Sequence, residues 1–141
     1  MAKLRADKKN YKKAFTIHAN AYDNWNLGSD NSRRLILCYC VECGLKCLIM
    51  DNDNICTISQ ANEKTEEVLC THDFRKLLKE VGQSGQFQFK QFVTEYGNTV
   101  CPSEYHQLCR YNIAPKDIED VIKFENVLNE IKNDSSLGCV V

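Results

Sequence analysis

Residues 35–50 read LILCYCVECGLKCLIM, and this stretch decides the fold. Its apolar side chains occur nearly all round a helix, which is typical of an element enclosed by the rest of a domain. The stretch is shorter than the ~20 residues needed to cross a bilayer, and Glu42 and Lys46 interrupt it. Residues 29–32 (SDNS) offer several N-caps. The sequence therefore predicts a buried central helix that ends near Met50.

Segments with helical periodicity lie on both sides of this central helix. From Tyr11 to Trp25, apolar residues recur at the spacing of one helix face, and Gly28 follows them. Other segments repeat the pattern, and none has a competing strand period. We predict helices or short helical segments over residues 3–27, 29–50, 63–69, 71–81, 89–96, 102–110 and 115–132. The predicted fold class is all-α, an up-and-down bundle of four to five main helices.

Composition places the chain among single globular domains. With 141 residues and 43% hydrophobic side chains, it can bury a core without disulfides or metal. We expect one domain over residues 1–134 and a short tail over residues 135–141. The N-terminal residues lack the apolar region of a signal peptide, and no segment is long enough to span a membrane. The expected location is the cytoplasm, with no membrane partner.

The charges are unevenly distributed although the formal net charge is −1. Residues 1–50 carry nine Lys or Arg against four Asp or Glu, whereas residues 51–141 carry nine against fifteen. Six of the basic residues fall within the first thirteen positions. A cationic helix end can bind an acidic partner such as RNA, but a solvated helix end gives the same pattern.

Nine cysteines are interpreted as reduced thiols, because the long periodic segments do not fit a secreted disulfide scaffold. Cys38, Cys40, Cys43 and Cys47 have a superficial metal-ligand spacing. On a helix, Cys38 and Cys40 lie about 200° apart, so the four thiols cannot converge on one ion. Cys40, Cys43 and Cys47 share a face and are expected to act as small buried hydrophobic residues. We predict no metal site.

No catalytic signature is present in the sequence. There is no glycine-rich phosphate loop, dinucleotide fingerprint or nucleophile elbow, and the three histidines form no HExxH pair. We therefore predict neither a cofactor nor a catalytic residue. Whether the protein is an enzyme stays open, with binding favoured over catalysis.

A few polar residues remain as candidates for a binding site. Glu42 and Lys46 are an i, i+4 pair on the apolar helix, where burial would require them to form an ion pair. On an exposed face the same pair would indicate nothing about function. His72-Asp73 opens a predicted helix whose N–H groups favour anions, although simple capping is equally compatible. Arg110-Tyr111 could contact a phosphate or a base, or could only tie helices together.

The order of these segments resembles the HEPN family (higher eukaryotes and prokaryotes nucleotide-binding). The segment YCVECGLKCL (39–48) resembles the AxExxLKALL helix of that family, and THDFRKLL (71–78) resembles its THDLxxLL helix start. YHQLCRY (105–111) is similar to its Y/WxxxxRY segment. A final amphipathic helix over residues 115–132 follows, so the resemblance covers roughly residues 8–132.

The resemblance implies a helical bundle that often dimerises and is frequently paired with a minimal nucleotidyltransferase in toxin–antitoxin or phage-defence systems. Some HEPN proteins are metal-independent ribonucleases with an Arg-x4-6-His motif. This chain departs from that motif, since none of its arginines is followed by a histidine at that distance and His106 precedes Arg110. The chain instead matches the motif residues of the other HEPN subgroup. The resemblance implies that these residues form a polar cluster that either binds a nucleotide or has a structural role: Glu42, Lys46, His72, Asp73, Arg110 and Tyr111.

Three functional hypotheses follow. The first, which we favour, is a non-catalytic HEPN module that binds a nucleotide, RNA or a partner nucleotidyltransferase, in a homodimer. The second is a HEPN ribonuclease toxin with an unorthodox site, in which His72 or His106 is the general base and Arg110 holds the phosphate. The third is a purely structural helical adaptor.

Overall fold

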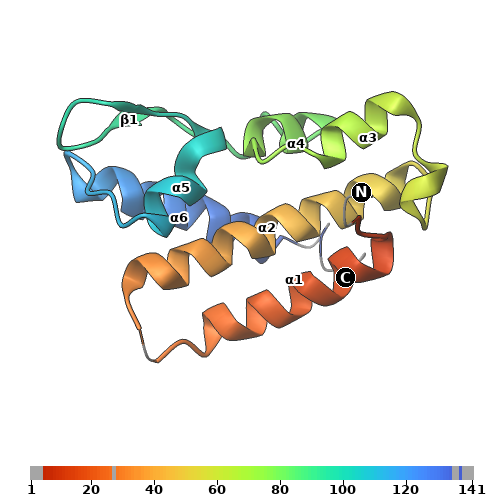
Figure 1. Ribbon diagram of the computed structural model, residues 1–141, viewed down its shortest axis with the longest axis horizontal. Coiled ribbons are helices and arrows are strands. Elements are labelled where there is room, and N and C mark those ends of the chain that lie inside the picture. Colours follow the sequence, from red (N-terminus) through yellow and green to blue (C-terminus); the bar gives the residue numbers. More distant parts are fainter. Residues whose placement is uncertain (1–4, 27, 135–136, 138–141) are drawn as a thin grey trace.

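The structure is a computed structural model, and it describes residues 5–26, 28–134 and 137. Within these residues the chain is mostly helical (Figure 1). The helices are α1 (Lys8–Asp23), α2 (Asp30–Asn52), α3 (Glu63–Leu69), α4 (Phe74–Glu80), α5 (Tyr105–Arg110) and α6 (Ile118–Lys132). Two 3₁₀ turns (Ile58–Gln60 and Pro102–Glu104) and a small hairpin of β1 (Phe92–Val93) and β2 (Thr99–Val100) complete it. Of the predicted tail, only Leu137 lies among the described residues.

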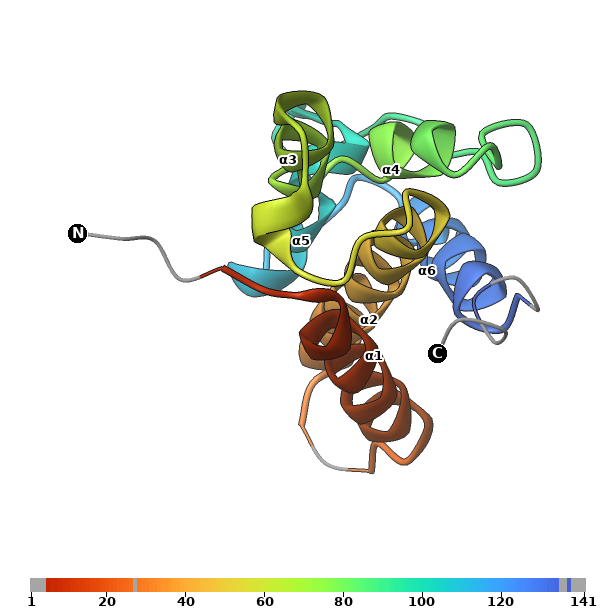
Figure 2. The same cartoon turned by 90° about the vertical axis from the view of Figure 1, so that its right-hand side faces the viewer.

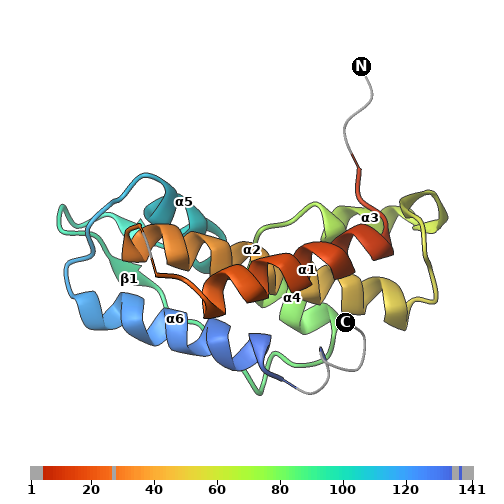
Figure 3. The ribbon, with the colours of Figure 1, turned by 90° about the horizontal axis from the view of Figure 1, so that it is seen from below.

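Helix α2 forms the centre of the molecule, as its sequence predicts. Helix α1 runs antiparallel to it and α6 runs in the same direction (Figures 1 and 3). In the end-on view of Figure 2, α1, α5 and α6 surround α2. Every residue from Gly44 to Met50 is buried. A Cβ atom at Gly44 would lie 2.7 Å from the Phe15 ring, so this glycine allows α1 to approach α2 closely.

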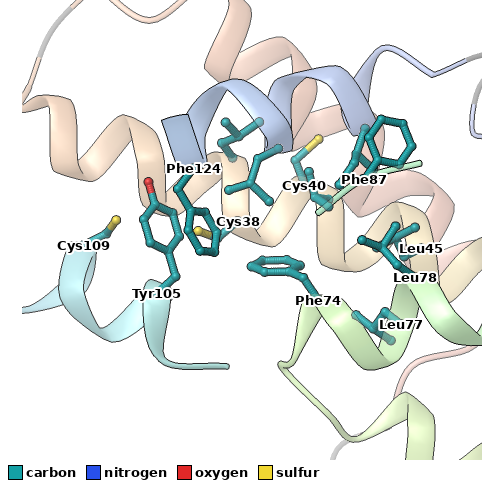
Figure 4. Close-up of a cluster of buried hydrophobic side chains, with 14 of the residues drawn as sticks. Cys38, Cys40, Leu45, Phe74, Leu77, Leu78, Phe87, Tyr105, Cys109 and Phe124 are labelled. Carbon is teal, nitrogen blue, oxygen red and sulfur yellow. The ribbon is translucent and has the colours of Figure 1, made fainter. Parts of the chain in front are cut away.

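Aromatic side chains fill the core between α2 and the later elements (Figure 4). The rings of Tyr105 and Phe124 are stacked with centroids 3.7 Å apart. Phe74, at the start of α4, meets Phe124 edge-on at 6.3 Å. Tyr105 is completely buried. Because Tyr105 is the first residue of α5, its burial fixes the position of this short helix against the core.

A partly buried polar contact ties the three long helices together. Glu125 on α6 accepts a hydrogen bond from the Tyr22 hydroxyl at 2.6 Å and one from Arg34 Nε at 2.9 Å. Burial and the hydrogen bond to Glu125 raise the pKa of Tyr22. One carboxylate thus joins α1, α2 and α6.

The ends of several helices differ from the predicted ones. Helix α1 begins at Lys8 and ends at Asp23, within the predicted range of 3–27, of which residues 3, 4 and 27 lie outside the described part. The helix predicted over residues 71–81, with Thr71 as its N-cap, begins instead at Phe74, since Asp73 caps α4 by accepting from Arg75 N at 3.0 Å. The last helix begins at Ile118, directly after its N-cap Asp117, because Pro115 pairs with Thr94 in a β-bridge.

The helix predicted over residues 89–96 is wrong, and so is the expectation that no strand is present. Phe92 pairs with Val100 in the β1–β2 hairpin. Gly97 has φ +86°, a conformation suited to a tight turn, and its N–H donates to Thr94 O at 2.9 Å. Tyr96, which the helical spacing put on an apolar face, is 84% exposed.

The thiols of α2 are buried as small apolar groups. Cys38, Cys40 and Cys47 are buried, and Cys43 is partly buried. Burial raises the pKa of Cys40 to about 12 and that of Cys43 to about 11, so these thiols stay protonated near neutral pH. Among the described residues, no helix combines the length and apolar character needed to cross a bilayer.

Candidate functional site

Polar side chains from three parts of the chain meet beside α2. They come from the middle of α2, from the residue before the N-cap of α4, and from α5. We call this group the polar constellation, and its members are Tyr39, Glu42, Lys46, His72, His106 and Arg110. The structure therefore brings together residues that are up to 71 positions apart in the sequence.

Glu42 is the centre of one half of the polar constellation. Its Oε1 lies 2.7 Å from His72 Nδ1, and its Oε2 lies 3.3 Å from Lys46 Nζ. The side chain of Lys46 is only 6% exposed and that of Glu42 is 15% exposed, whereas that of His72 is 56% exposed. The carboxylate thus neutralises a buried ammonium on one side. On the other side it orients an imidazole that solvent can reach.

His106 brings α5 into the same group. Its ring centroid lies 5.1 Å from that of His72. Burial, the neighbouring His72 and the charge of Arg110 lower the pKa of His106, against a weaker opposing effect of Glu42. The neutral imidazole is therefore the form favoured near pH 7. His106 and Arg110 are four residues apart on α5 and lie on one face of it.

Arg110 occupies the outer end of the polar constellation. Its Nη2 donates to the Tyr39 hydroxyl at 2.5 Å, which links α5 to α2. Hydrogen bonds to Tyr39 and Tyr111 raise the pKa of Arg110, so the guanidinium stays charged. The residue is exposed. Its remaining N–H groups can bind an external anion, because a guanidinium has five donors.

The predicted site residues separate into two groups. Glu42, Lys46 and His72 lie together, and Arg110 joins them through Tyr39 and His106. Asp73 instead caps α4 and forms an ion pair with Arg75, with Oδ1 and Nε 3.4 Å apart. Tyr111, 64% exposed, follows the last residue of α5 and contacts Arg110.

One member of the polar constellation, Tyr39, was not among the residues predicted for the site, and His106 was predicted only as a candidate general base in the ribonuclease hypothesis. His106 lies four residues before Arg110, a spacing that places two side chains on the same face of a helix. That signal was available in the sequence. Tyr39 begins the segment that resembles the HEPN helix, but the sequence gives no sign that its hydroxyl would face Arg110.

The arrangement is suited to binding an anion. Lys46 is neutralised by Glu42, so Arg110 adds a positive charge beside two imidazoles that can donate hydrogen bonds. Charged donors of this kind bind phosphate oxygens strongly. Among the described residues, no three His, Cys, Asp or Glu side chains are grouped closely enough to hold a metal ion.

Comparisons with known proteins give no match for this chain. No protein-family model matches it. No curated protein and no solved structure is significantly similar to it.

Proposed function

We propose that the protein is a HEPN-type helical module whose polar constellation binds the phosphate of a nucleotide or of RNA without cleaving it. The observation that supports this most directly is the position of Arg110. Its exposed guanidinium lies on the same face of α5 as His106, and His106 lies beside His72. Order and spacing of the three sequence segments support the HEPN assignment, and so does the helical fold built around α2.

The chemistry of a phosphate fits these side chains. Arg110 would provide the permanent charge, because its guanidinium remains protonated at all physiological pH values. His106 would donate a hydrogen bond to one of the remaining oxygens, and His72 would donate another through Nε2 when its ring is protonated. Either ring can stack against a base or ribose. Glu42 would hold the His72 ring in place through the 2.7 Å contact with Nδ1, which leaves Nε2 free to face the ligand.

Binding of a fluorescein-labelled ten-residue uridine RNA, measured by anisotropy, tests this proposal. We expect Arg110→Ala to weaken binding at least about tenfold, as expected for loss of a charged hydrogen bond. It should also lower the salt slope by roughly 0.7. Lys64→Ala, at an exposed lysine outside the polar constellation, is the matched control and should bind as the parent does. Equal affinities for all three proteins would contradict the proposal.

A second candidate function, RNA cleavage, is favoured by one specific observation. The ring centroids of His72 and His106 lie 5.1 Å apart, and the two rings have different environments. His72 contacts the Glu42 carboxylate, and His106 has a lowered pKa. In this scheme neutral His106 would take the proton of a ribose 2′-hydroxyl, whose oxygen would attack the adjacent phosphorus. The P–O5′ bond would break, and His72 would protonate the leaving 5′-oxygen. The products would be a 2′,3′-cyclic phosphate and a 5′-hydroxyl.

Incubation of the purified protein with the same RNA distinguishes the two functions. Under the first proposal the RNA stays intact at every protein concentration. Under the second, cyclic phosphate ends accumulate, and they disappear in His106→Ala, with folding checked by circular dichroism. Cleavage that persists in both His72→Ala and His106→Ala would exclude these residues as the catalytic pair.

The resemblance also supports two partners, a second copy of the chain and a minimal nucleotidyltransferase. The half-exposed His72 and the exposed Arg110 lie at a surface that a partner could complete. Light scattering during size-exclusion chromatography tests the homodimer, for which we expect a mass twice the 16.2 kDa of the chain. A mass of one chain at all concentrations would contradict it.

A further inference from the structure

Away from the polar constellation, two adjacent hollows lie on either side of Phe89. The first has a volume of about 360 Å³ and lies between residues 88–92 and helix α6. The second has a volume of about 420 Å³ and lies between the outer face of α4 and residues 84–89. Both are lined by Gln88 and Phe89, so they form one surface. We call it the Phe89 groove, defined by Arg75, Lys79, Gln88, Phe89, Lys90 and Lys123.

The wall between the two hollows is aromatic and firmly supported. Phe89 is partly buried, and its ring centroid lies 4.5 Å from that of Phe124 and 5.6 Å from that of Phe74. Phe87 and Phe92, which precede and follow it in the sequence, are buried. Each hollow therefore offers an apolar wall that an apolar side chain can cover without rearrangement of the core.

The rim of the Phe89 groove is positively charged. Lys79, Lys90 and Lys123 are exposed and form no ion pair among the described residues. Among the described residues, Asp120 is the one acidic residue that lines either hollow. Such a rim is complementary to acidic side chains placed on both sides of an apolar contact.

The backbone along the Phe89 groove is free to pair. Residues 88–91 are neither helical nor part of a strand, and they lead directly into β1. No backbone–backbone hydrogen bond is found for these four residues within the described part of the chain. Gln88, Lys90 and Gln91 are exposed. A segment whose N–H and C=O groups pair with no other backbone group can accept a strand beside it.

We propose that the Phe89 groove binds an extended, acidic peptide segment of another protein. Its backbone would pair with residues 88–91, and its apolar side chains at alternate positions would enter the two hollows. Its Asp or Glu side chains would meet Lys79, Lys90 and Lys123. The free backbone favours a peptide over a nucleic acid, because a polynucleotide has no groups that continue a β-ladder.

This binding site is separate from the polar constellation. The Phe89 groove is lined by residues of α4, α6 and the segment 84–92, whereas the polar constellation comes from α2, α5 and His72, the residue before the N-cap of α4. The two surfaces share no residue.

Selection from a phage library of random dodecapeptides tests the proposal. We expect the enriched peptides to combine at least two Asp or Glu with apolar residues two positions apart. An enriched peptide, synthesised with a fluorescein label, should bind Lys90→Glu/Lys123→Glu at least tenfold more weakly than the parent. The control variant Lys13→Glu/Lys64→Glu carries the same change of charge at exposed lysines elsewhere and should bind like the parent. Circular dichroism checks that both variants fold.

Hydrogen exchange of the backbone amides gives a second, independent measurement. On saturation with the peptide, the amides of residues 88–91 should exchange at least tenfold more slowly, as expected when a strand pairs with them. The proposal is overturned if no peptide is enriched, if enriched peptides lack acidic residues, or if both double variants bind equally well. Unchanged exchange at residues 88–91, or displacement of the peptide by ten-residue uridine RNA, would also overturn it.

Discussion

Replacing Glu42 by Gln should destabilise the fold through Lys46. The side chain of Lys46 is 6% exposed, and Glu42, with Oε2 3.3 Å from Lys46 Nζ, is its ion-pair partner. Leaving a fully buried charge unpaired costs about 3–5 kcal/mol. Because the Glu42 side chain is 15% exposed, water can partly replace the carboxylate. We therefore expect a loss of about 2 kcal/mol, which for a chain of this size lowers Tm by roughly 6–10 °C.

A double-mutant cycle measured by urea denaturation isolates this effect. In Glu42→Gln/Lys46→Met both charges are gone, and a thioether of similar length occupies the space of the buried lysine. The double variant should recover about 1–2 kcal/mol relative to Glu42→Gln alone, because neutral groups replace a buried ion pair at little cost. A Glu42→Gln protein within ~0.5 kcal/mol of the parent would refute the reasoning, since it would show that Lys46 does not depend on this carboxylate.

Three further predictions concern other parts of the molecule. Exposed Cys56 and Cys70 should react with a thiol reagent in the native protein, whereas Cys40, with a pKa raised to about 12, should react only after unfolding. His106 has a pKa below its ordinary value of 6.5, so the unfolded state binds more protons below that pH. Stability should fall as the pH drops from 6.5, and less steeply in His106→Asn, as followed by urea denaturation. Gly44→Ala should destabilise by roughly 1–3 kcal/mol in the same assay, because the added methyl group overlaps the Phe15 ring.

The central part of the fold could be predicted from sequence because one element carries an unambiguous pattern. Apolar residues all round residues 35–50 leave no face for solvent, so other helices must enclose them. The short helix at residues 63–69 was also predicted correctly. Its signals are local, since Asn62 caps it by accepting from Thr65 N at 2.8 Å.

The hairpin could not be predicted by spacing alone. Phe89, Phe92, Val93 and Tyr96 fit one helix face, but the strand is selected by contacts far away in the sequence. Lys116 N donates to Val93 O at 2.9 Å, and Glu95 N donates to Ala114 O at 3.0 Å. Helical periodicity contains no information on such partners.

The polar constellation was predictable only in part for the same reason. The i, i+4 pairing of Glu42 with Lys46 follows from helix geometry. The approach of His72 to His106 depends instead on how α5 packs, which the burial of Tyr105 against Phe124 determines. No local pattern specifies that contact.

The most direct test of the account is a titration of the protein with uridine 3′-monophosphate, followed by NMR signals of the histidine side chains. Binding at the polar constellation predicts saturable shifts of the His72 and His106 signals in the parent protein. These shifts should be lost in Arg110→Ala, whose other signals stay in place. Unchanged histidine signals at saturating nucleotide, or equal shifts in Arg110→Ala, would contradict the claim that these residues form a phosphate-binding site.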